Sequence, residues 1–102
     1  MIFVANFESN HTRKTTKEYM QKLNAYKTEH TIWVFPPATA LDEFKGSVRV
    51  GVQNAFATHN GAYTGELGLE QLDEFNIKTI LIGHSERRLI IGETLGWLQE
   101  KF

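Results

Sequence analysis

The sequence predicts an α/β fold in which parallel strands alternate with helices. Short runs of apolar, β-branched and aromatic residues recur along the chain, and amphipathic segments separate them. The runs are apolar throughout rather than at every second position, which is typical of parallel strands that are covered on both faces. We expect four strands, at residues 2–7, 31–35, 48–53 and 79–83.

A helix is expected after each of these strands. Residues 12–29 carry apolar side chains at helical spacing among charged ones, and Thr15 or Thr16 is the expected N-terminal cap. The other expected helices are a short one within 38–44, one over 66–75 that Asn76 ends, and one over 93–102. Four βα units in succession require right-handed crossovers between parallel strands, so a β-sandwich and a helical bundle are excluded.

Length and composition are those of a single globular domain, which we place at residues 1–102. The 11 basic and 12 acidic side chains are interspersed and give a net charge of −1, which argues against a nucleic-acid or membrane-surface partner. The chain has no cysteine, so a disulfide framework and a thiolate metal site are excluded. The apolar start lacks the basic region of a signal peptide and no run reaches transmembrane length, so a cytoplasmic protein is expected.

Polar side chains follow three of the predicted strands. In a parallel α/β protein, chemistry gathers at the carboxyl ends of the strands, where loops vary without disturbing the core. The candidates are Asn6, Glu8, Gln53, Asn54, His84, Ser85 and Glu86. His84 by itself has a plain structural interpretation, which is a buried histidine bonded to the backbone. The acid and the two guanidinium groups at 86–88 favour a functional interpretation instead.

Two other kinds of site find little support in the sequence. The histidines are scattered, with no pair at the spacing of a metal site, so no metal is expected; they are His11, His30, His59 and His84. A flavodoxin-like binding domain would share the alternation of strands and helices. However, no glycine-rich phosphate loop of the dinucleotide or P-loop type is present.

Residues 83–88 carry a specific family resemblance. The segment Gly-His-Ser-Glu-Arg-Arg resembles, without a gap, the signature loop of the triosephosphate isomerase family. Further segments resemble the same family in the same order, at residues 5–7, 35–37, 51–54, 61–66 and 91–94. The resemblance covers essentially the whole chain and implies the amino-terminal (β/α)4 half of a TIM (β/α)8 barrel.

The resemblance also implies an activity and roles for individual residues. The family interconverts dihydroxyacetone phosphate and glyceraldehyde 3-phosphate through an enediolate, in glycolysis and gluconeogenesis, as a homodimer without a cofactor. The active site of this family is a standard example of pKa tuning, in which a neutral histidine polarises the substrate carbonyl and a glutamate removes the proton. His84 matches that catalytic electrophile, and Asn6 matches a substrate-binding position. Ser85 and Glu86 match accessory positions, and Thr64 matches the loop tip that reaches the neighbouring subunit.

Two departures from the family pattern argue against activity of this chain alone. Glu8 stands where the family has a lysine that attracts the substrate phosphate, so the sign of the charge is reversed. The barrel needs eight βα units, so the glutamate base, the lid and the later phosphate loops belong beyond residue 102. We therefore expect residues 1–102 to associate with further copies or with a carboxyl-terminal half, because the end strands keep open edges. The alternative is a non-catalytic half-barrel or assembly module.

Overall fold

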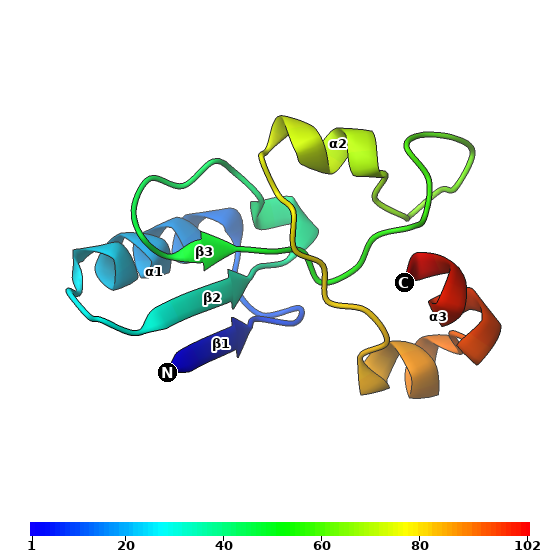
Figure 1. Cartoon of the computed structure of the whole chain (residues 1–102), viewed down its shortest axis with the longest axis horizontal. Coiled ribbons are helices and arrows are strands. Elements are labelled where there is room, and N and C mark those ends of the chain that lie inside the picture. The colour runs from blue at the N-terminus through cyan, green and yellow to red at the C-terminus, as the bar shows by residue number, and fades with distance from the viewer.

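The computed structural model describes all of residues 1–102 and contains a parallel sheet of three strands (Figure 1). These are β1 (Ile2–Asn6), β2 (Thr31–Phe35) and β3 (Arg49–Val50), and they lie side by side in that order. The register of β1 on β2 runs from Ile2 opposite Thr31 to Asn6 opposite Phe35. The predicted α/β class with parallel strands is confirmed, and β1 and β2 lie within one residue of their predicted bounds.

The predicted fourth strand, residues 79–83, is present only as one parallel bridge between Val52 and Ile80. The Val52 amide donates to the Thr79 carbonyl over 3.0 Å, and the Leu81 amide donates to the Val52 carbonyl over 2.8 Å. Because no strand lies on the outer side of this segment, its backbone is bonded on one side only. The prediction of four full-length strands was therefore wrong, although the order and direction of the segments hold.

Helix α1 (Arg13–Ala25) follows β1 and is shorter than predicted. Its N-terminal cap is Thr12 rather than Thr15 or Thr16. The Thr12 hydroxyl accepts from the Thr15 amide over 3.2 Å, and the Thr15 hydroxyl accepts from the Thr12 amide over 2.8 Å. This reciprocal arrangement satisfies two free amides at the helix start. Thr16 is instead buried beneath the helix, together with Met20.

The remaining helical segments are short, and one of them was not predicted. They are the 3-10 turn η1 (Ala38–Ala40), α2 (Leu69–Glu74), the π-helix η2 (Arg87–Ile91) and α3 (Leu95–Lys101). Asn76 follows α2 with a left-handed φ of 56°, as expected for an asparagine that ends a helix. The Thr94 hydroxyl caps α3 by accepting from the Trp97 amide. The π-helix η2 has no periodicity signal in the sequence, because it is a single widened turn.

Two small apolar clusters form the core. The first joins β1, β2 and α1, and its buried members are Phe7, Met20, Val34 and Val48. The second lies beneath α2, and its buried members are Val52, Ala55, Leu72 and Ile77. The first cluster packs α1 against β1 and β2, and the second packs α2 against the segment that follows β3.

Apolar side chains remain exposed on β1 and around η2. Only 15 of the 102 residues are buried, and β1 is bonded to β2 alone, so its other edge is open. Exposed apolar side chains are found on β1 and around η2, namely Ile2, Phe3, Val4, Leu89, Ile90, Ile91 and Leu95. In Figure 1, η2 and α3 lie to one side of the sheet. No helix of the structure has the length and apolar character needed to cross a bilayer.

Candidate functional site at the carboxyl ends of the strands

A groove of about 570 Å³ lies at the carboxyl ends of the strands. It brings together most of the polar residues that the sequence singled out. Those that line it are Asn6, Glu8, Gln53, Asn54, His84, Glu86 and Arg87. Because the strands are parallel, segments far apart in the chain end at the same edge and face one another there.

The loop after β1 is held tightly and presents Glu8. The Asn6 side-chain oxygen accepts from the Glu8 amide over 3.1 Å. The Gln53 side-chain amide donates to the carbonyls of Glu8 and Phe35, over 2.8 and 2.9 Å. Glu8 has a φ of 55°, a left-handed conformation that non-glycine residues rarely adopt. The backbone at Glu8 is therefore fixed by two side chains, and Gln53 has a structural role here.

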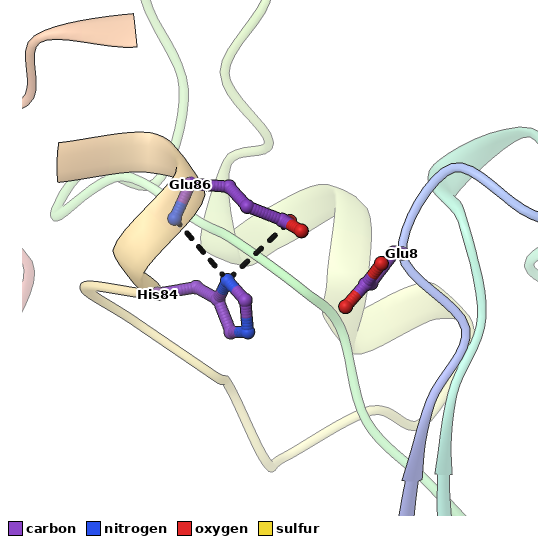
Figure 2. Close-up of side chains that lie close together, drawn as sticks. All are labelled: Glu8, His84 and Glu86. Carbon is purple, nitrogen blue, oxygen red and sulfur yellow. Dashed lines mark hydrogen bonds and ion pairs between the residues drawn. The ribbon is translucent and has the colours of Figure 1, made fainter. Parts of the chain in front are cut away.

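His84 lies across the groove from Glu8, at the start of the turn that leads into η2 (Figure 2). Its carbonyl accepts from the amides of Arg87 and Arg88, over 2.9 and 3.2 Å. The turn that leads into η2 therefore begins at the His84 carbonyl. The Nδ1 atom is 3.4 Å from both the Glu86 amide and the Glu86 carboxylate. A neutral Nδ1 accepts from the amide and a protonated one donates to the carboxylate, and both contacts are long.

Glu8, His84 and Glu86 approach one another within the groove (Figure 2). One imidazole nitrogen and one oxygen of each carboxylate all lie within 4.8 Å of one another. The histidine spacing in the sequence does not reveal this group, because the group contains a single histidine. The only signal in the sequence was that Glu8 and Glu86 both follow predicted strands and so share one edge of the sheet.

A second charged cluster lies next to the groove and is buried. The Lys101 ammonium contacts oxygens of Glu93 at 2.6 Å, Asn54 at 2.7 Å and Glu66 at 3.1 Å. Arg87 donates to the same Glu93 oxygen over 3.0 Å. The side chains of Lys101 and Glu93 are fully buried. Arg87 and Asn54 therefore have structural roles in this cluster, and the sequence analysis did not single out Lys101.

The environment of Glu93 sets its protonation. Burial raises the pKa of the Glu93 carboxyl, but hydrogen bonds from Lys101 and Arg87 outweigh that effect and leave the pKa below its ordinary value of 4.5. One carboxylate oxygen accepts from both cations, and the other, Oε1, has no hydrogen-bond partner. Glu93 is thus an ionised carboxylate held by two cations in the interior of the chain.

Two further residues from the sequence prediction lie outside the groove. Ser85 is exposed and makes no side-chain hydrogen bond. Thr64 is exposed in the loop between β3 and α2, next to Gly65, which lines the groove. The roles inferred for Asn6, His84 and Thr64 concern a substrate and a second subunit, so they stay predictions.

Comparison with known proteins settles the family. The family model described as triosephosphate isomerase matches residues 1–102. The chain belongs to the triosephosphate isomerase family. Three triosephosphate isomerases similar to it come from a Sulfurovum species (58% identical), a Nitratiruptor species (53%) and Wolinella succinogenes (52%). Each alignment covers 100% of this chain.

The match to triosephosphate isomerase is partial in length. This chain spans 46%, 45% and 47% of those three relatives, which is slightly less than half of each. The three parallel strands and the bridge at residues 52 and 80 fit part of a triosephosphate isomerase barrel. The family assignment inferred from residues 83–88 is therefore confirmed.

Proposed function

We propose that residues 1–102 form the first four βα units of an enzyme that interconverts dihydroxyacetone phosphate and glyceraldehyde 3-phosphate. The observation that carries this proposal is that Asn6 and His84 line one groove at the carboxyl ends of the strands. In the family reaction, His84 polarises the substrate carbonyl and Asn6 contacts the substrate. The glutamate that removes the proton and the loop that excludes water come from βα units outside residues 1–102. The reaction needs no cofactor.

The rest of the proposal follows from the family. We place the protein in the cytoplasm, in glycolysis and gluconeogenesis, and as a homodimer in which Thr64 reaches the partner subunit. The exposed loop around Thr64 is compatible with such a contact. Ser85 and Glu86 have accessory roles beside His84.

Glu8 lowers the activity that we expect. A carboxylate replaces an ammonium at the position where the family binds the substrate phosphate, so attraction becomes repulsion. Two unit charges about 4 Å apart interact by roughly 4 kcal/mol at an effective dielectric of about 20. That energy corresponds to a factor of roughly 10³ in rate or binding.

The first test is a coupled isomerase assay on the protein at the full length that its gene encodes, and on residues 1–102 mixed with a carboxyl-terminal half from the family. Glu8→Lys should raise kcat/KM by about 10³-fold. His84→Gln in the Glu8→Lys background should remove most of that gain. Glu74→Lys makes the same charge change on an exposed part of α2 and should leave the rate unchanged. No turnover in any of these samples would contradict the proposal.

A second candidate function is a non-catalytic half-barrel that assembles with other chains. The open edge of β1 and its exposed apolar side chains favour it, because such an edge is a template for pairing. Light scattering of residues 1–102 at several concentrations tests it. This candidate predicts a stable oligomer without turnover, whereas a compact and active monomer would contradict it.

A further inference from the structure

We infer that Glu8, His84 and Glu86 form a binding site for a divalent transition-metal ion such as Zn²⁺. Figure 2 shows the two carboxylates and the imidazole ring directed toward a common space in the groove. The three side chains come from two loops that lie far apart in the chain, one after β1 and one before η2. This inference does not depend on the proposed isomerase activity, because it concerns binding of the ion alone.

The donor atoms are close to the separation that a metal requires. Zinc bonds to nitrogen and oxygen are about 2.0–2.2 Å long, so adjacent donors in a tetrahedral site lie about 3.4 Å apart. His84 Nδ1 and Glu86 Oε2 are 3.4 Å apart. One imidazole nitrogen and one oxygen of each carboxylate lie within 4.8 Å of one another, so the side chains must move closer together to bind one ion. The side chains of His84 and Glu86 are 32% and 50% exposed, which leaves them free to adjust.

The charges at this site also favour a cation. No lysine or arginine forms a salt bridge with Glu8 or Glu86, and the only ionic contact of Glu86 is with the His84 ring. By contrast, the buried acids Glu66 and Glu93 are matched by Arg87 and Lys101. The groove therefore holds two carboxylates without a fixed cation, and a divalent ion would balance their charge.

The backbone on both sides of the site is positioned before any ion binds. The Glu8 amide donates to the Asn6 side chain and the Glu8 carbonyl accepts from Gln53, and these bonds hold the backbone of Glu8 in its left-handed conformation. On the opposite side, Arg88 donates to the Gly83 carbonyl over 2.9 Å, next to His84. Such support lowers the entropy cost of placing ligands around an ion.

The donor set indicates which ions bind. One imidazole nitrogen with two carboxylate oxygens suits Zn²⁺ and neighbouring first-row ions such as Co²⁺ or Mn²⁺. Mg²⁺ and Ca²⁺ prefer shells made of oxygen alone, and larger ones than two carboxylates supply. Three protein ligands leave at least one coordination position directed into the groove, where water or a small ligand can bind.

The test is a titration of the protein, at the full length that its gene encodes, with Zn²⁺ in a calorimeter and with Co²⁺ in a visible spectrometer. Before the titration, the protein is treated with a chelator, which is then removed by dialysis. We expect one ion per chain, and d–d absorption bands that show Co²⁺ bound to protein ligands. Glu8→Gln and Glu86→Gln should each weaken binding at least 10-fold. Glu74→Gln removes the same charge on exposed α2 and should leave binding unchanged.

Three results would overturn the inference. These are the absence of saturable Zn²⁺ binding, wild-type affinity in both glutamine variants, and displacement of Zn²⁺ by an equal concentration of Mg²⁺. Circular dichroism checks that each variant is folded. If Glu8→Gln is unfolded, Glu86→Gln carries the test, because that side chain is half exposed and has no other ionic partner than His84. The titration reads binding and the isomerase assay reads turnover, so the two proposals fail separately.

Discussion

Two clusters of acidic side chains in this chain are built in opposite ways. Glu66 and Glu93 are nearly or fully buried, and Lys101 and Arg87 contact both of them. Glu8 and Glu86 lie at the open groove with one imidazole between them and no fixed cation. The difference follows from solvation. A buried carboxylate without a partner is too costly to persist, whereas a solvated one is tolerated.

The comparison separates stability from function. In the buried cluster each charge supports the fold, because removing one member leaves another charge uncompensated in the interior. In the open cluster the two carboxylates repel each other, so they contribute nothing to the fold unless something binds between them. The open cluster at the carboxyl ends of the strands, where Glu8 and Glu86 have no fixed cation, is therefore the place to test for ligand binding.

The largest expected effect comes from breaking the buried cluster. Lys101→Met should lower the free energy of unfolding by about 3–5 kcal/mol, because Glu93 and Glu66 lose their shared cation. Urea denaturation followed by circular dichroism measures it. Lys78→Met is the matched control, since Lys78 pairs with Asp73 at 2.8 Å but both side chains are exposed, and it should change stability little. Equal losses in the two variants would mean that burial does not distinguish the clusters.

Much of the fold could be predicted because it depends on local patterns. The apolar runs located β1 and β2, and the helical spacing located α1, with ends off by a few residues. The fourth strand was predicted at full length because its sequence is strongly apolar. In the structure it is one bridge at Ile80, because a strand's length depends on neighbours on both sides.

The site could be predicted only in part. The rule that polar residues gather at strand ends correctly placed Asn6, Glu8 and His84 at one groove. It did not reveal that Lys101 is buried, because that depends on contacts with Asn54 and Glu66 from distant segments. In sequence, a lysine near the end of a helix indicates a solvated side chain that complements the helix dipole. In the structure, packing against these distant segments buries the Lys101 side chain instead.

A smaller effect is expected from pH, and it belongs to the buried cluster. The pKa of Glu93 is lowered in the folded chain, despite burial, by hydrogen bonds from Lys101 and Arg87. Above its ordinary value of 4.5 the carboxyl is ionised in both states, and its stabilisation is fully present. As pH falls through the lowered pKa, the unfolded state takes up the proton first and the stabilisation is lost.

Urea denaturation at several pH values between about 6 and about 3 measures how the free energy of unfolding depends on pH. In Glu93→Gln the loss of stability below 4.5 should be smaller than in the wild type. Glu74→Gln removes an exposed carboxylate and should keep the wild-type slope. An unchanged slope in Glu93→Gln would show that other carboxyls account for the acid sensitivity.

The smallest effect is expected at the open cluster and has the opposite sign. With a chelator present, Glu8→Gln should raise the free energy of unfolding by about 0.5 kcal/mol, because it relieves repulsion between two half-exposed carboxylates. Glu86→Gln should do the same, and the double variant should gain little more, since the second change has no repulsion left to remove. Saturating Zn²⁺ should reverse the order, because the wild type binds Zn²⁺ at least 10-fold more tightly than the variants and so gains more stabilisation from it. Glutamine variants that stay more stable than the wild type in Zn²⁺ would mean that the open cluster is only a site of repulsion.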